Sequence, residues 1–168
     1  MSAKPCQLHT NALLSACRAE GAYVDCYCID SPWRVSQAEY VEAFYTTAVF
    51  RVERLVLRWV LSKPSSDRDT RLLAEGARET FAVWQGEARD ADRLLLADVT
   101  GRTKSWLMSA PVGDGHGNAT RLYFGSAVMP ARHRATGERR LGPVFHALLG
   151  FHQCYSRVLL TAARARLA

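Results

Sequence analysis

The chain has 168 residues, a formal charge of +6, 48% hydrophobic residues and 23% charged residues. A chain of this length and composition can bury a hydrophobic core of its own, which excludes a disordered, collagen-like or disulfide-scaffold protein. No apolar stretch reaches the roughly 20 residues that cross a bilayer, so we expect one globular domain over residues 1–168 without integral membrane contact.

The N-terminal region, residues 1–21, is weakly patterned and predicts only a short helix at 11–19, ended by Gly21. It begins without an apolar signal core, so we expect a cytoplasmic protein. The odd number of cysteines, five, favours reduced thiols. Cys26 and Cys28 lack a second pair to complete a metal site and are interpreted as small core residues of one strand. We therefore expect no metal and no other cofactor.

The first strong elements are a strand and two helices. Residues 22–30 are rich in aromatic and β-branched side chains and predict a strand. Ser36 and Glu39 then fit a capping box, and apolar residues at steps of three and four predict a long amphipathic helix that ends near residue 61. A Ser-Ser-Asp cap predicts a second, short helix at 68–77.

From residue 80 the hydrophobic period changes from helical to extended, which indicates an antiparallel meander. The expected strands are 80–87, 93–100, 103–110 and 120–129, with a glycine-rich turn at 111–118 before the last of them. The arginine-rich stretch 132–140 lacks hydrophobic periodicity and is interpreted as a solvated loop. Because no aromatic residue stands between its arginines to stack on a base, we expect no nucleic-acid binding.

The last element is a helix over residues 143–167, opened by a proline at a position where its missing amide costs nothing. Its apolar residues form two stripes and cover more than half of the circumference, which predicts a helix covered on more than one side. The two stripes are Val144, Leu148, Phe151, Tyr155, Val158, Leu159 and Ala162, and Phe145, Leu149, His152 and Leu160.

This order of a strand, two helices, a meander and a closing helix resembles the helix-grip plan of the START-like superfamily, which includes lipid-transfer domains and polyketide cyclases. Residues 121–126 (RLYFGS) and 149–152 (LGFH) also resemble small uncharacterised bacterial members. The resemblance implies an α+β fold in which a curved antiparallel sheet packs around the C-terminal helix and leaves a cavity for an apolar ligand. Five strands are expected here, whereas members of the superfamily usually have seven. Either two short strands exist around residues 85–105, or the sheet and its cavity are smaller.

A ligand cavity is mostly apolar, with a few polar groups that orient the ligand. The candidate wall residues are large side chains that would equally fill a core without any cavity. They are Trp84, Trp106, Met108, Phe124, Phe151 and Tyr155. Asp98 stands inside an apolar strand and is a candidate for a polar group of the cavity. The alternatives are that it lies in water at the strand end or forms a salt bridge. His152 could hydrogen-bond a ligand carbonyl from the cavity, or be an ordinary core or surface histidine.

The sequence holds no nucleophile elbow, zinc-protease motif or phosphate loop. The leading hypothesis is binding of a small apolar or amphipathic ligand between the sheet and the C-terminal helix. One alternative is a cavity enzyme of the cyclase or hydrolase type that uses Asp98, His152 or Tyr155. Another is a homodimeric interaction module that pairs through the Tyr23, Tyr27 and Ile29 strand face or through an exposed part of the helix 37–61.

Overall fold

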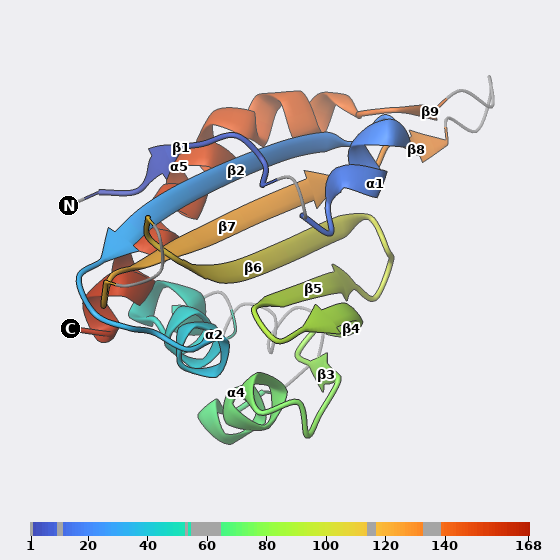
Figure 1. The fold of residues 1–168 in the computed structure, drawn as a ribbon. Coiled ribbons are helices and arrows are strands. Elements are labelled where there is room, and N and C mark those ends of the chain that lie inside the picture. The colour runs from blue at the N-terminus through green and yellow to red at the C-terminus, as the bar shows by residue number, and fades with distance from the viewer. Residues whose placement is uncertain (1, 10–11, 53, 55–64, 114–116, 133–138) are drawn as a thin grey trace.

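The computed structural model describes residues 2–9, 12–52, 54, 65–113, 117–132 and 139–168 (Figure 1). The strands are β1 (Lys4–Pro5), β2 (Tyr23–Ser31), β3 (Thr80–Phe81), β4 (Trp84–Asp90), β5 (Arg93–Asp98), β6 (Thr103–Pro111), β7 (Thr120–Val128), β8 (Ala131–Arg132) and β9 (Arg139–Arg140). The helices with defined bounds are α1 (Ser15–Ala19), α2 (Gln37–Tyr45), α4 (Asp67–Ala74) and α5 (Pro143–Arg166).

The main sheet has seven antiparallel strands in the order β1-β2-β7-β6-β5-β4-β3. The α+β class, with a curved antiparallel sheet against a long C-terminal helix, is confirmed and has the helix-grip arrangement (Figure 1). The two strands missing from the sequence prediction are β1 and β3, and both lie outside the window of residues 85–105. Each has only two residues, which is too short for an alternating pattern to show.

The expected strand 80–87 is divided between β3 and β4. The two strands pair with each other, with Phe81 opposite Trp84, so the chain reverses at the residues between them. Ala82 takes φ of +53°, in the left-handed region that a residue with a Cβ seldom adopts. No glycine or asparagine marks this reversal in the sequence, which explains why a single strand was predicted.

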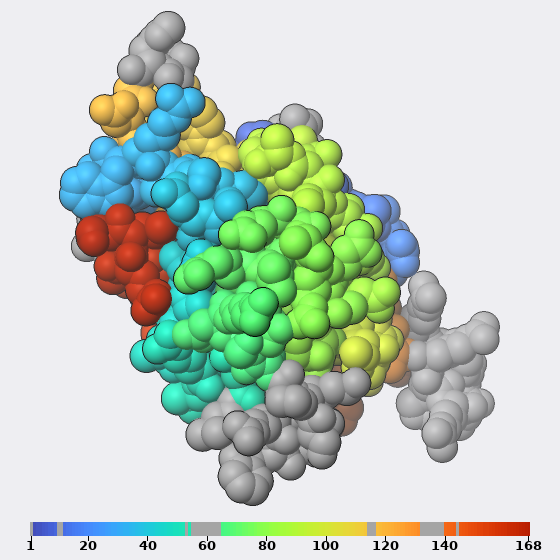
Figure 2. Space-filling view, turned by 90° about the horizontal axis from the view of Figure 1, so that it is seen from below, coloured from blue at the N-terminus to red at the C-terminus, as the bar shows by residue number. Residues whose placement is uncertain are grey.

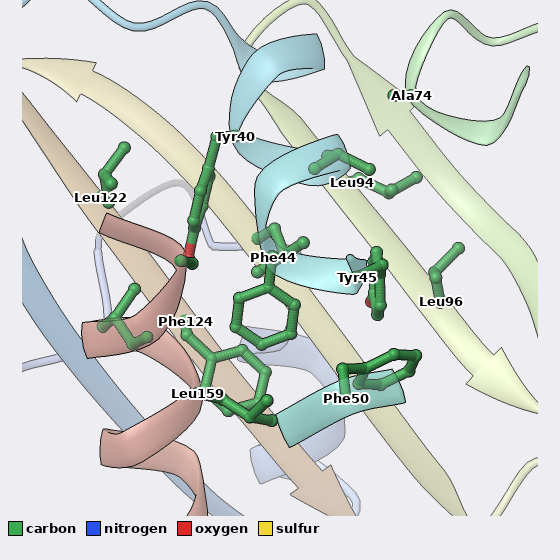
Figure 3. Packing of buried hydrophobic residues seen from close by; sticks show 14 of the residues in the cluster. Tyr40, Phe44, Tyr45, Phe50, Ala74, Leu94, Leu96, Leu122, Phe124 and Leu159 are labelled. Atoms are coloured by element: carbon green, nitrogen blue, oxygen red, sulfur yellow. The ribbon is translucent and has the colours of Figure 1, made fainter. Parts of the chain in front are cut away.

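The central strands of the sheet are buried on both faces. One face carries α2, α4 and α5, and its core contains Phe44, Leu96, Leu107, Phe124 and Leu160 among other residues (Figure 3). Seen from below, α2 and α4 form one surface with β4 and β5, and the end of α5 lies beside α2 (Figure 2). The opposite face is covered by the N-terminal segment with α1, over a second core of Leu14, Cys17, Cys26, Trp106 and Met108 with their neighbours. The strands therefore bury both sets of alternating side chains.

Local capping signals place the helices correctly. Ser36 and Glu39 form the predicted capping box at the start of α2, and Ser66 forms a second box with Asp69 at the start of α4. However, α2 ends at Tyr45, earlier than predicted. Thr47 starts a new helical segment at residues 48–52, because its Oγ1 accepts a hydrogen bond from the Phe50 amide at 3.1 Å. Residues 55–61 of the expected helix lie outside the described residues.

Helix α5 is covered on one side only, which corrects the expectation of cover on more than one side. Leu159, Leu160 and Ala163 are buried against the sheet and α2. On the outer side Leu148 is 54%, Phe151 70% and Val158 45% exposed. An apolar stripe shows which residues share a helix face, but not whether the chain has a second layer to cover it.

The strand face proposed for a homodimer is mostly covered, and of its three residues only Tyr23 is half-buried. Tyr27 and Ile29 are each 4% exposed, because β2 lies beneath α5.

The arginine-rich stretch also differs from the prediction, since β8 and β9 pair as a short ladder with Arg132 opposite Arg139. Residues 133–138 between them lie outside the described residues.

Gly125 in the middle of β7 is required by the packing of the second core. A Cβ at this position would lie 2.8 Å from Leu14 Cδ1, 2.9 Å from Trp106 Cε3 and 3.3 Å from the Asp25 carbonyl oxygen. We expect Gly125→Ala to lower the free energy of unfolding by about 1–3 kcal/mol in urea denaturation, the usual cost of overpacking. Gly150→Ala is the matched control, because nothing lies within 4 Å of a Cβ there, and alanine should stabilise helix α5 by about 0.5–1 kcal/mol. Equal stabilities of the two variants would contradict this packing.

Candidate functional site

A pocket of about 130 Å³ lies between the sheet and α5. It is lined by Phe44, Tyr45, Phe50, Trp84, Thr103, Lys104, Ser105, Phe124, Ser126, His152, Tyr155, Ser156 and Leu159. Six of these side chains are aromatic, and they come from segments that are far apart in the sequence. Because a protein cavity of about 150 Å³ admits benzene, the pocket has room for roughly one ring.

The aromatic wall is held in place by ring contacts around Phe44. The Phe44 ring lies 4.8 Å from that of Phe124 on the sheet and 5.1 Å from that of Tyr45 (Figure 3). Tyr45 in turn contacts Phe50, with 4.9 Å between ring centroids. The Tyr45 hydroxyl is 2.9 Å from Ser105 Oγ, so the ring is fixed at its polar end as well. These contacts form the apolar part of the pocket without any ligand.

The other part of the pocket is polar and is formed by Ser126 of β7 and His152 of α5, with Asp25 of β2 behind them. Asp25 stands directly opposite Ser126 in the strand register. Ser126 Oγ donates to Asp25 Oδ1 at 2.6 Å and lies 2.8 Å from His152 Nε2, which is also 3.4 Å from Asp25 Oδ2. The Asp25 side chain is only 10% exposed, and that of His152 is 26% exposed. A nearly buried carboxylate is thus joined to α5 through a serine.

The direction of these hydrogen bonds follows from the number of protons. A serine hydroxyl has one proton, and in this cluster it goes to the carboxylate. The contact with His152 is therefore a bond from Nε2–H to Ser126 Oγ. In a serine-hydrolase triad the histidine uses one nitrogen for the serine and the other for the carboxylate, whereas here both partners face Nε2. The cluster is suited to holding a polar group of a ligand and does not have the triad geometry.

Two tyrosines of the same strand face surround Asp25. Burial, and after it the negative charge of Asp25, raises the pKa of Tyr27. Burial also raises the pKa of Tyr23, whose hydroxyl accepts a hydrogen bond from Gln153 Nε2 at 3.0 Å. Both phenols therefore stay protonated at neutral pH. Asp25 has uncharged phenols beside it on β2 and His152 across from it on α5.

Four of the eight predicted site residues line the pocket: Trp84, Phe124, His152 and Tyr155. Trp106 and Met108 do not, which corrects the prediction. They alternate along β6 with Ser105 and Leu107 and therefore project to the opposite face, where they belong to the second core.

Phe151 and Asp98 also lie away from the pocket. Phe151 is on the outer side of α5 and stacks on Tyr155 with 5.9 Å between ring centroids. Asp98 is the last residue of β5, and its Oδ1 accepts hydrogen bonds from the amides of Thr100 at 3.1 Å and Arg102 at 2.9 Å in the turn that follows. This is a usual role of aspartate in turns. Of the three candidates of the enzyme alternative, the pocket therefore brings together His152 and Tyr155 but not Asp98.

Sequence reasoning missed Asp25 and Ser126. A signal for Asp25 was available, because it is a charged residue between Tyr23 and Tyr27 on one face of a predicted strand. Ser126 becomes notable only through the register that places it opposite Asp25, 101 residues earlier in the chain.

In the described part of the chain, no helix is long and apolar enough to cross a membrane, and no three His, Cys, Asp or Glu side chains are grouped to hold a metal ion. Comparison of the whole chain with family models, with curated proteins and with solved structures gives no match. The resemblance to the START-like superfamily therefore stays a prediction that rests on the order of the elements.

Proposed function

We propose that this protein is a START-like binding protein whose pocket between the sheet and α5 takes a small molecule with an apolar ring and a polar group. The observation that carries this proposal is the composition of the pocket wall. Rings such as Phe44 and Phe124 form most of it, and Ser126 and His152 stand together at one side. Binding pockets usually combine apolar walls with a few placed polar groups in this way.

The size of the pocket limits the ligand. Pockets for drug-sized molecules have volumes of about 300–1,000 Å³, and this one has about 130 Å³. A long acyl chain does not fit such a volume. The proposed ligand is therefore a single substituted ring, or a larger molecule that inserts one ring and leaves the rest outside.

The polar group of the ligand should be a hydroxyl. The Ser126 hydroxyl proton is used by Asp25, and one oxygen lone pair accepts from His152. The second lone pair can accept a hydrogen bond from a ligand O–H. We therefore expect phenol to bind more tightly than benzene.

This expectation can be tested by NMR titration of the wild type and Ser126→Ala with phenol and with benzene. Loss of one hydrogen bond, about 0.5–1.5 kcal/mol, should weaken phenol binding by about two- to tenfold and leave benzene binding unchanged. Ser109→Ala is the matched control, since Ser109 is also a buried serine of the sheet but does not line the pocket. If neither compound shifts the resonances of pocket residues in the wild type, the proposed function is wrong.

A further inference from the structure

Two cysteines face each other across the first strand pair of the sheet. β1 pairs with β2 so that Lys4 is opposite Cys28 and Pro5 opposite Tyr27, which places Cys6 opposite Cys26. The Cys6 amide donates to the Cys26 carbonyl at 3.0 Å. Residues in such a hydrogen-bonded pair have Cα atoms about 5.5 Å apart, close to the commonest Cα separation in disulfides.

The two sulfur atoms are already close to each other. Cys6 Sγ lies 3.3 Å from Cys26 Sγ, and both thiols are free. Forming a bond of about 2.05 Å needs a closure of little more than 1 Å, which side-chain rotation can supply without moving either strand. Three cysteines remain. Cys17 is buried in the second core, Cys154 is exposed on α5, and Cys28 is half-buried on β2, opposite Lys4.

The pair can be reached by a small reagent. Cys6 is only half-buried, and both Cys6 and Cys26 line an open groove of about 610 Å³ between the N-terminal segment, β2 and α5. Arg18 and Arg157 lie on the same groove. Because Cys6 is the more exposed residue of the pair and Cys26 is buried, we expect a peroxide to react first at Cys6.

We propose that Cys6 and Cys26 are a site of reversible oxidation, at which a peroxide converts the two thiols to an intrachain disulfide. Cys6 sulfur attacks a peroxide oxygen, the O–O bond breaks, and Cys6 becomes a sulfenic acid with release of one water from hydrogen peroxide. Cys26 sulfur then attacks Cys6 sulfur, the S–O bond breaks, and a second water leaves with the Cys26 proton. Two thiols are oxidised by two electrons and one peroxide is reduced to two waters.

The disulfide would link the N-terminal segment covalently to β2. This segment pairs with β2 over only two residues, and it contacts α5 through a bond from the Ala3 amide to Thr161 Oγ1 at 3.1 Å. A covalent link at Cys6 would hold it against β2 beside the groove. The oxidised protein should therefore unfold at a higher urea concentration, and the amides of Ala3, Lys4 and Cys6 should exchange more slowly than in the reduced protein.

The rate of oxidation should rise with pH. The hydrogen bond with Cys26 and, next, burial raise the pKa of Cys6, and burial is the main cause that raises the pKa of Cys28 to about 11. The thiolate is the nucleophile in these reactions, so little of the reactive form exists at neutral pH. More alkaline solution should speed up formation of the disulfide until the thiol is fully ionised.

The experiment uses the full chain with Cys154→Ser, which removes the exposed thiol and with it disulfides between molecules. The protein is treated with hydrogen peroxide, alkylated and analysed by intact mass and by peptide mapping without reduction. The expected product has lost two hydrogen atoms, links Cys6 to Cys26, and returns to the thiol form with dithiothreitol. Adding Cys28→Ser should leave this product intact, and adding Cys6→Ser should abolish it.

Three outcomes would overturn the proposal. One is a link between Cys6 and Cys28 instead of Cys26. Another is oxidation of Cys6 to sulfinic acid with no link. The third is a link that persists in the Cys6→Ser variant. Because mapping of the Cys154→Ser protein alone decides the first two outcomes, the test does not depend on whether the other variants fold.

Discussion

Phe44→Ala is expected to lower the free energy of unfolding by about 3–5 kcal/mol, the usual cost of truncating a buried phenylalanine. Phe44 is 1% exposed and packs between α2, the sheet and α5 (Figure 3). Its ring contacts those of Tyr40, Tyr45 and Phe124 at centroid distances of 6.1, 5.1 and 4.8 Å. Removing the ring leaves a cavity in the layer that joins all three elements.

The measurement is urea denaturation, with Phe151→Ala as the matched control. Phe151 is also a phenylalanine of a helix, but it is 70% exposed, so its removal should change stability by only about 0.5 kcal/mol. Phe44→Ala should also enlarge the pocket, so that a two-ring compound such as naphthalene binds to the variant better than to the wild type. Equal losses of stability in the two variants would show that the layering of α2 over the sheet is wrong.

Trp106→Ala should also cost about 3–5 kcal/mol, but through the opposite face of the sheet. Trp106 is fully buried and packs in the second core with Leu14 and with Tyr123, whose ring centroid is 6.2 Å away. Since it does not line the pocket between the sheet and α5, its substitution should leave phenol binding unchanged.

A second variant makes this prediction testable even where the alanine variant unfolds. Trp106→Phe keeps an aromatic ring and should be less destabilised, so its phenol affinity can be measured in the folded state. An affinity equal to that of the wild type is expected. A large loss of phenol affinity in a folded Trp106→Phe protein would place Trp106 in the binding site and contradict the assignment of the two faces.

The parts of the fold that could be predicted are those with a signal in a short stretch of the sequence. The capping boxes at Ser36 and Ser66 and the proline at residue 143 set the starts of three helices, and all three are confirmed. The end of α2 was not predictable from periodicity, because the apolar pattern continues through Thr46 and Thr47 while Thr47 caps a new segment. The two-residue strands β1 and β3 form by pairing with the edges of the longer strands β2 and β4.

Only part of the site could be predicted, because the sequence does not show which face of a strand lies toward the pocket. Alternation along β6 separates Trp106 and Met108 from Ser105 and Leu107, but both sets are buried, so the pattern cannot show which set faces the pocket. Trp84, Phe124 and Tyr155 of the expected wall line this pocket, as does the polar candidate His152.

The polar side of the pocket depends on long-range geometry. The contact between Asp25 and Ser126 requires the register of β2 against β7, and the contact with His152 requires α5 to lie across both strands. None of these relations has a local signal in the sequence, so the site could be completed only in three dimensions.

The central claim is that a hollow, ligand-accepting space exists beneath α5, although the outer side of this helix is exposed. The most direct measurement is a crystal structure of the protein under xenon pressure, because xenon enters apolar cavities of this size and its anomalous scattering identifies it. We predict a xenon site among Phe44, Phe124 and Leu159, which line the pocket. Xenon bound only at the exposed side of α5, with close-packed side chains where the pocket should be, would contradict the claim.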